Sequence, residues 1–384
     1  MQFNTNPIAW NDPKRQDAFQ DWFAHLCIKH DLNPSTLTLA SADASFRRYF
    51  RVNRALNPGQ SLIIMDAPPN LENSHAFVKI CHMMQAAGLL VPDVLEWQES
   101  LGFLLLSDLG HQTMMQALTA PTGLWGGLAS MGDEHSHVLV PTENTLELFK
   151  DATNALITWQ LASQPHVLPN YDATLLHQEL AFFPTWYIAQ NKNFNLQAPG
   201  QNWTELLDAV FAQIVKHNLS TPSVFVHRDF MPRNLMLALD ENEKRLGVLD
   251  FQDSVYGPIT YDIASLMRDA FVSWPEEFAL DVTIRYWENA KKHGLLDSNG
   301  LWNDFGAFYR EVEWMGLQRH LKIAGIFSRL SLRDQKHHYA KDIPRFINYI
   351  RSTCYRYREL GPFLKFIDEV EHIQTQDGFA FGRV

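Results

Sequence analysis

The sequence is short of several features that mark particular classes of protein. Its three cysteines, Cys27, Cys81 and Cys354, are scattered and form no Cys-x-x-Cys pair, so we expect neither a disulfide framework nor a cysteine metal site. It has no run of basic residues and a net charge of −11, which argues against a nucleic-acid partner. No apolar run approaches the ~18 residues that span a bilayer, so we expect no membrane partner.

The first residues also lack a basic segment followed by an apolar core, the pattern of a secretion signal. Together with the cysteine usage, this favours a reducing, cytoplasmic location. The composition, 46% hydrophobic and 20% charged, is ordinary for a globular protein of two domains or two lobes. We expect the chain to be a monomer.

The most informative pattern lies around two short β-type runs, Ser223–Val226 and Leu246–Leu249. Each is followed by an acidic residue, Asp229 and Asp250, and Asn234 lies between them. This His-Arg-Asp-x-x-x-x-Asn pattern, followed by a strand and Asp-Phe, is typical of the catalytic loop and metal-binding turn of the kinase fold. Phosphoryl transfer from ATP needs a carboxylate that faces the acceptor hydroxyl and oxygen ligands for Mg²⁺. Each residue alone could be an ordinary turn residue, but the agreement of strand and spacing favours a kinase.

The N-terminal part of the chain predicts a small sheet with two helices. A helix begins at Asn11-Asp12-Pro13, where a cap residue precedes a proline. It is followed by five β-type runs and a second helix: Thr36–Leu39, Phe46–Val52, Ser61–Met65, a helix ending near Gly88, Val94–Trp97 and Phe103–Leu106. Three strands, a helix and two strands are the order of a kinase N-lobe.

From Glu143 onward the apolar residues recur at helical spacing. One helix is expected around Leu146–Leu156, and another from Leu175 to Tyr187 with Glu179 on or beside its apolar stripe. Further helical stretches are Tyr261–Phe271, Pro275–His293, Asp304–Leu330 and Pro344–Tyr357.

The expected fold is therefore α+β and bilobal, like that of protein kinases. The N-lobe, residues 1–108, holds a five-stranded antiparallel sheet with a helix. The C-lobe, residues 109–384, is mostly helical and contains the catalytic loop, residues 224–253. Residues 120–142, which are rich in small residues, are expected to form an inserted loop.

Two features that kinases normally carry are missing. The loop between the first two strands, Ser41–Arg48, has no glycine, so a phosphate cradle must use small residues and hydroxyls, with charge from Arg47 or Arg48. The third strand has no lysine to grip the phosphates, although Glu72 could be the acid that normally pairs with it. Alternatively, the arginines face solvent in a polar hairpin loop, and Glu72 is a first-turn residue that favours the helix dipole.

These missing groups leave two hypotheses: a small-molecule kinase, or a module that binds nucleotide without turning it over. The joint retention of Asp229, Asn234 and Asp250 favours the enzyme. Its acceptor is expected to be small, because only a short link, Phe251 to Tyr261, separates Asp250 from Asp262. Protein kinases need a long segment there to present a peptide, followed by Ala-Pro-Glu, which is absent here.

Several segments together make the chain similar to the aminoglycoside-phosphotransferase-like kinases. More closely, it resembles their bacterial cell-wall-recycling branch, the anomeric kinases of N-acetylmuramate and N-acetylglucosamine. The segments are Ala44–Arg51, Met65–Pro69, Leu106–Gly110, His227–Asp229 with Asn234, Leu249–Asp253, Tyr256–Pro258 with Tyr261-Asp262, and Arg319–Lys322 with Gly325–Phe327. In that branch the Met-Asp-Ala-Pro-Pro strand is usual, so the missing lysine becomes a family trait. Met231, where a polar residue is expected, and the 120–142 insertion depart from the pattern.

This resemblance implies ATP-dependent phosphorylation of the C1 hydroxyl, giving the sugar α-1-phosphate for peptidoglycan recycling. Asp229 would orient that hydroxyl and accept its proton. Asn234 and Asp250 would hold Mg²⁺. His227 would fix the loop by hydrogen bonds.

The resemblance also implies binding residues for both substrates. The expected nucleotide contacts come from the first loop and the hinge: Ser41, Asp43, Ser45, Phe46, Arg47 and Asp108. Glu179 would accept hydrogen bonds from sugar hydroxyls, or else be paired in the core. Arg319 and Lys322 would meet the lactyl carboxylate of a muramate, or else form a basic face paired with nearby acids. An aminoglycoside, choline, fructosamine or homoserine stays open as the acceptor.

Overall fold

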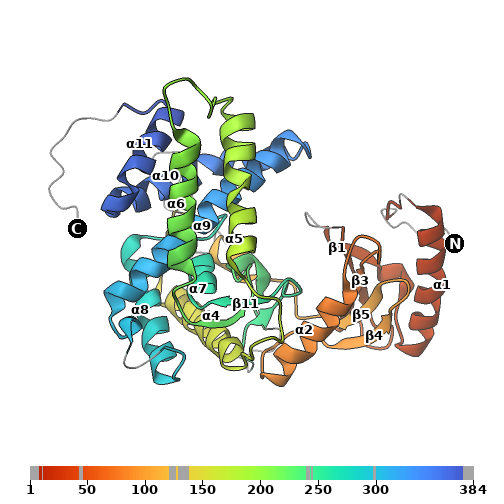
Figure 1. The fold of residues 1–384 in the computed structure, drawn as a ribbon. Helices are drawn as coiled ribbons and strands as arrows, with labels where there is room; N and C mark the ends of the chain where they lie inside the picture. Colours follow the sequence, from red (N-terminus) through yellow and green to blue (C-terminus); the bar gives the residue numbers. More distant parts are fainter. Residues whose placement is uncertain are drawn as a thin grey trace. The chain divides into compact units, whose positions relative to one another are not determined.

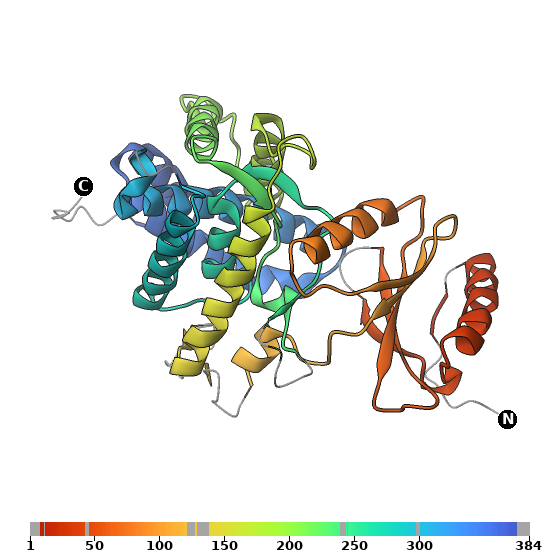
Figure 2. The same ribbon diagram turned by 90° about the horizontal axis from the view of Figure 1, so that it is seen from below.

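The computed structural model describes residues 8–374, apart from residues 11, 43–45, 121–126, 129–137, 239–242, 244 and 297–299. Figure 1 and Figure 2 show its helices and strands in two views. The chain forms two compact units, the first from Met1–Met114 with Asn234–Asp253 and the second from Met115–Arg233 with Ser254–Val384.

The stretch with the kinase pattern is shared between these units. Asp229 belongs to the second unit, whereas Asn234 and Asp250 belong to the first. The functional division into lobes at residue 108 stays a prediction.

The first unit is built on the five-stranded antiparallel sheet that the sequence predicted. Its strands lie in the order β1-β2-β3-β5-β4. They are β1 (Thr38–Ala42), β2 (Arg48–Asn53), β3 (Ser61–Asp66), β4 (Val94–Gln98) and β5 (Phe103–Ser107). β1 begins later than expected because Pro34–Thr36 forms a 3₁₀ turn, capped by the Asn33 side chain, which accepts from Ser35 N.

Two helices cover opposite faces of this sheet (Figure 1). α1 (Pro13–Lys29) begins where predicted, since the Asp12 side chain accepts from Lys14 N and Pro13 needs no donor. Its residues Phe19, Phe23 and Leu26 form a core with inward-facing strand residues: Phe50, Val52, Leu62, Ile64, Phe103 and Leu105. α2 (Ser74–Ala86) lies on the other face and is capped by Asn73.

A hairpin from the catalytic stretch completes the first unit. β9 (Leu235–Met236) pairs antiparallel with β10 (Gly247–Val248). Val248 N donates to Leu90 O at 2.7 Å, which attaches the hairpin to the segment after α2. Gly247 also lets the hairpin pack closely against Leu109, since a Cβ there would lie 2.8 Å from Leu109 Cδ1.

The second unit is mostly helical, as predicted. The described helices of eight or more residues are α4 (Glu143–Leu161), α5 (Ala173–Leu180), the π-helix Phe183–Asn191, α6 (Trp203–Asn218), α7 (Thr260–Met267), α8 (Glu276–Lys292), α9 (Phe305–Leu332), α10 (Ile343–Arg356) and α11 (Gly361–Val370). A ribbon of β8 (Ser223–Val226) and β11 (Val255–Pro258) leads into and out of the catalytic stretch. In the described part of the chain, no helix is both long and apolar enough to cross a bilayer.

Two predicted helices differ from the observed ones. The helix expected to run from Leu175 to Tyr187 ends at Leu180, and a π-helix follows, because Pro184 has no N–H for the α-helical ladder. α7 ends at Met267 because the Asp269 carboxylate accepts from the next backbone N–H groups. The expected 120–142 insertion lies mostly outside the described residues.

Candidate active site

The catalytic loop follows β8 in the second unit and is held by a buried carboxylate. Asp262, on α7, accepts from His227 N at 2.7 Å and from Arg228 N at 3.0 Å. Asp229 N in turn donates to His227 Nδ1 at 3.3 Å. His227 is buried, so the contacts agree with the structural role expected for it. The loop's backbone is therefore fixed at the predicted base and at the two residues before it.

Asp262 was part of the recognised sequence pattern, but sequence reasoning assigned it no role. Burial raises the pKa of its carboxyl to about 6, although the charge of His227 and the two donated N–H groups oppose the shift. The hydrogen bonds from His227 N and Arg228 N thus hold the buried Asp262 carboxyl group in place. The signal in the sequence was the position of Asp262 in the first turn of the helix that follows β11.

Arg228 has a left-handed backbone conformation, with φ of 77°. For a residue with a Cβ this costs on the order of 1 kcal/mol, so the surroundings must enforce it. Asp262 accepts from its N–H, and Arg319 Nη1 donates to its carbonyl oxygen at 2.8 Å. Arg319, on α9, therefore contributes directly to the shape of the catalytic loop.

Glu179, a predicted sugar ligand, lies buried at the centre of a charged cluster. Its Oε1 accepts from Arg228 Nη2 and from Lys322 Nζ, both at 2.7 Å. The hydroxyl of Tyr171 donates to its other oxygen. Burial alone would raise the pKa of Glu179, but the two cations and these hydrogen bonds hold it below the ordinary value. Glu179 is therefore paired with two cations, and its role toward a sugar stays a prediction.

Arg319 and Lys322 lie one turn apart on α9; Arg319 reaches the catalytic loop, and Lys322 reaches Glu179 beside it. The Arg319 guanidinium stacks 4.8 Å from the centre of the Tyr261 ring, and Lys322 Nζ lies 3.3 Å from the Tyr261 hydroxyl. Burial would lower the pKa of both cations, but the Tyr261 hydroxyl and nearby carboxylates, among them Asp229, raise it. The predicted base and the predicted acceptor residues thus form one cluster within the second unit.

The two predicted metal ligands are neighbours in the first unit. Asn234 directly precedes β9 and Asp250 follows β10 after Leu249, whose N–H donates to Asn234 O at 2.9 Å. Asp250 has a φ of 63°, and its Oδ1 accepts from Gln252 Nε2 at 2.8 Å.

An amide oxygen and a carboxylate fit Mg²⁺, which takes few protein ligands and completes its shell with water and phosphate oxygens. Within the described residues, no group of three His, Cys, Asp or Glu side chains could hold a metal. A magnesium ion at Asn234 and Asp250 would therefore depend on nucleotide phosphates. The convergence of Asp229 with these two residues stays a prediction.

The predicted nucleotide residues are described only in part. Asp43 and Ser45 lie outside the described residues, and Ser41 lies in β1 without a described side chain. Phe46 is exposed, whereas Arg47 is buried and pairs with Glu72 at 2.7 Å.

The side chain of Asp108, the predicted hinge residue, links several segments of the first unit by hydrogen bonds. Its carboxylate accepts from Arg51 Nε at 2.6 Å, from Ser61 Oγ at 2.6 Å and from Gly110 N at 3.0 Å. Burial would raise its pKa, but these donors lower it below the ordinary value. The side chain therefore fixes the end of β5, and a role of its backbone in nucleotide binding stays a prediction.

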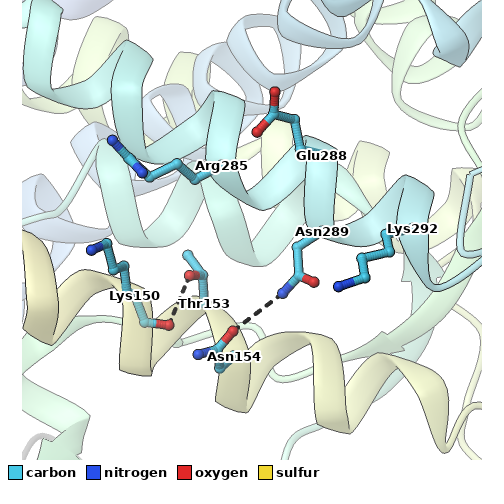
Figure 3. A pocket seen from close by; sticks show the side chains of 7 residues that line it. All are labelled: Lys150, Thr153, Asn154, Arg285, Glu288, Asn289 and Lys292. Atoms are coloured by element: carbon cyan, nitrogen blue, oxygen red, sulfur yellow. Dashed lines mark hydrogen bonds between the residues drawn. The ribbon is translucent and has the colours of Figure 1, made fainter.

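A surface pocket of about 340 Å³ lies between α4 and α8 (Figure 3). Its lining residues are Lys150, Thr153, Asn154, Arg285, Glu288, Asn289 and Lys292. Lys150 pairs with Glu147, and Arg285 with Asp281, both on the same helix as their partners. The pocket contains none of the predicted site residues, and we assign it no role.

The pattern of the family described as Phosphotransferase enzyme family matches residues 36–295. The chain belongs to this family. A protein of Neisseria meningitidis serogroup B named N-acetylmuramate/N-acetylglucosamine kinase is 40% identical over 372 residues, which cover 96% of this chain and 100% of that protein. A protein of the same name from Pseudomonas aeruginosa is 42% identical over 332 residues, with 86% of this chain and 87% of that protein covered.

Solved structures support the fold of this phosphotransferase. ADP-bound aminoglycoside phosphotransferase APH(2'')-Ib superimposes with a TM-score of 0.52 at 14% identity, covering 86% of this chain and 97% of the other. Plasmodium vivax ethanolamine kinase gives a TM-score of 0.54 at 10% identity, covering 91% and 99%. The kinase-like α+β fold predicted from the sequence is confirmed. The phosphotransferase is a kinase, which decides against the non-catalytic nucleotide-binding module.

Proposed function

We propose that this kinase transfers the γ-phosphoryl group of ATP to the anomeric C1 hydroxyl of N-acetylmuramate or N-acetylglucosamine, giving the sugar α-1-phosphate for peptidoglycan recycling in the cytoplasm. The similarity that carries the proposal extends over 96% of the chain, to a protein named for these two sugars. The observed cluster around Asp229 is compatible with such an acceptor.

The charges around Glu179 also favour some acceptors over others. A cationic acceptor, such as choline or an aminoglycoside, needs a carboxylate that is free to bind it. Glu179 is bound by Arg228 and Lys322, so its charge is already neutralised. An ammonium group has three N–H donors, and Glu179 and Tyr261 accept from two of those of Lys322. Counting only described residues, one donor is left, which would suit the carboxylate of N-acetylmuramate.

In the proposed reaction, Asp229 orients the C1 hydroxyl and accepts its proton as the phosphoryl group is transferred. An anomeric hydroxyl is more acidic than an ordinary alcohol, so the demand on this base is modest. Asn234 and Asp250 would hold Mg²⁺, which neutralises the charge on the phosphates. Orientation of the hydroxyl and neutralisation of charge then supply most of the rate.

A substrate panel tests this function. ADP release is measured with N-acetylmuramate, N-acetylglucosamine, choline, an aminoglycoside, fructosamine and homoserine, and ³¹P NMR identifies the phosphorylated oxygen. We expect turnover with one or both N-acetylated sugars and a phosphate on C1. Turnover confined to another acceptor, or a phosphate on C6, would refute the assignment.

The Lys322→Met variant tests the charge argument separately. We expect its KM for N-acetylmuramate to rise more than its KM for N-acetylglucosamine, because only the former carries a carboxylate. An equal change for both sugars would show that Lys322 does not recognise that group.

A further inference from the structure

The first unit has to bind phosphates without a lysine on β3. In protein kinases such a lysine grips the α- and β-phosphates, whereas the only charged residue of β3 is Asp66. Asp66 is buried and accepts from Arg15 Nε at 2.8 Å and from Arg48 Nε at 2.9 Å. These two arginines therefore neutralise a structural carboxylate.

Arg47 is held differently from its neighbour Arg48. It is only 7% exposed, and its Nη2 lies 2.7 Å from Glu72 Oε2. Glu72 precedes Asn73, the N-cap of α2, so it is not a residue of the helix itself. Its Oε1 accepts from Phe46 N at 3.0 Å. One carboxylate thus orients both Arg47 and a backbone N–H of the loop between β1 and β2.

β2 begins at Arg48, directly after Arg47, and its side chains alternate between the two faces of the sheet. Arg48 pairs with Asp66 across the strands, and Phe50 lies on the same face, which packs against α1. Tyr49 faces the other way, toward the side that carries α2.

The pKa of the Tyr49 hydroxyl is affected by Arg47 and by two carboxylates. Burial raises the pKa of the Tyr49 hydroxyl, the charge of Arg47 lowers it, and the charges of Asp250 and Glu72 raise it. Arg47, Glu72 and Asp250, all in the first unit, therefore each lie within electrostatic reach of the Tyr49 hydroxyl. We call Arg47, Tyr49, Glu72 and Asp250 the Arg47 cluster. It contains one cation and two carboxylates, one of which is a predicted metal ligand.

Packing also couples the metal-binding turn to α2. Phe251, the residue after Asp250, contacts Phe77 of α2 with ring centres 4.9 Å apart. Glu72, which directly precedes the N-cap of the same helix, holds Arg47. The position of α2 thus fixes Asp250 and Arg47 together.

We propose that Arg47, oriented by Glu72, binds the nucleotide phosphates in the place of the missing lysine of β3. This rests on the proposed use of ATP and names the group that neutralises its phosphates. A guanidinium has five N–H donors, so it can keep its bond to Glu72 while other donors meet phosphate oxygens. Glu72 is a positioning residue in this arrangement.

The Arg47→Ala variant of the full chain tests the proposal by calorimetric binding without sugar. We expect its Kd for Mg-ADP to rise about 10- to 100-fold, the value of a charge-assisted contact. The Kd for adenosine should stay unchanged, because adenosine has no phosphate. Arg47→Lys should lie between the wild type and Arg47→Ala, since a lysine is a point charge without the paired geometry of the guanidinium.

Glu72→Gln tests the positioning role. It should weaken Mg-ADP binding by itself. In the Arg47→Ala background it should add nothing, because both changes remove the same oriented guanidinium. A matched control is Lys29→Ala, which removes the exposed 2.5 Å ion pair between Lys29 and Glu96 of the same unit and should not change Mg-ADP affinity.

Wild-type affinity of Arg47→Ala for Mg-ADP would overturn the proposal. An equal loss of adenosine affinity would also overturn it, because the arginine would then only support the fold. Since no sugar is present, either outcome is distinguishable from a failure of the sugar-kinase assignment.

Discussion

The Asp262→Asn variant separates what this buried carboxylate does for the catalytic loop from its effect on the stability of the fold. Asp262 is 1% exposed and accepts from His227 N and Arg228 N. Burial raises its pKa from 3.8 to about 6. Asparagine has nearly the same shape but does not ionise, so it removes the titration while leaving one acceptor oxygen.

The sign of the stability effect follows from this shift. The folded protein binds the proton of Asp262 more tightly than the unfolded chain does. This proton therefore stabilises the fold fully below the unfolded pKa of 3.8, and the stabilisation is lost as the pH rises through the folded pKa of about 6. A shift of roughly 2 pKa units corresponds to about 3 kcal/mol. Because part of this effect lies below pH 4, we expect the free energy of unfolding of Asp262→Asn, minus that of the wild type, to increase by about 2.4 kcal/mol from pH 4 to pH 7.

Urea unfolding followed by tryptophan fluorescence across this pH range measures that difference. Comparing the two proteins cancels the titration of all other groups. A difference that does not change with pH would refute the raised pKa.

The same variant should lose activity at pH 7. One of the two backbone N–H groups then faces the amide nitrogen instead of an oxygen, and an unsatisfied buried N–H costs about 1–3 kcal/mol. If the loop distorts in response, kcat falls about 10- to 100-fold. An unchanged kcat, together with the expected pH effect on stability, would show that the loop keeps its shape without the second acceptor.

Three further variants test the roles of individual carboxylates. Asp229→Asn should abolish turnover while Mg-nucleotide still binds by calorimetry, and near-normal kcat would remove Asp229 as the base. Asp250→Asn should remove the gain in nucleotide affinity that Mg²⁺ gives the wild type, so a retained gain would place the metal elsewhere. Glu179→Gln should lower the free energy of unfolding by about 3 kcal/mol, because it leaves two partly buried cations without the buried carboxylate that pairs with both. Glu147→Gln, which removes an exposed pair, should change it by less than about 1 kcal/mol in the same urea experiment.

The candidate catalytic and metal residues could be identified from the sequence because the relevant signals are local. The spacing from His227 to Asn234 and the strand before Asp250 lie within one short stretch of chain. The five strands of the first unit could be predicted for the same reason, since strand alternation is visible over a few residues. Strand ends were less accurate where a turn capped by Asn33 replaced the expected start of β1.

The break in the helix after Leu180 was missed although its signal, Pro184, is in the sequence. The apolar period continues through the proline and predicts one helix, whereas the backbone needs an N–H that proline lacks. Periodicity alone therefore overestimated the length of this helix.

By itself, the sequence determined the kinase pattern, the order of strands and helices, and the absence of a lysine on β3. Tertiary structure alone decided which charges neutralise one another. Lys322 meets Glu179 across 143 residues of chain, and Arg47 turns toward Glu72 while Arg48 turns toward Asp66. Local spacing sets the period of a helix or strand, but an ion pair forms only where packing brings two side chains within a few ångströms in a site that excludes water.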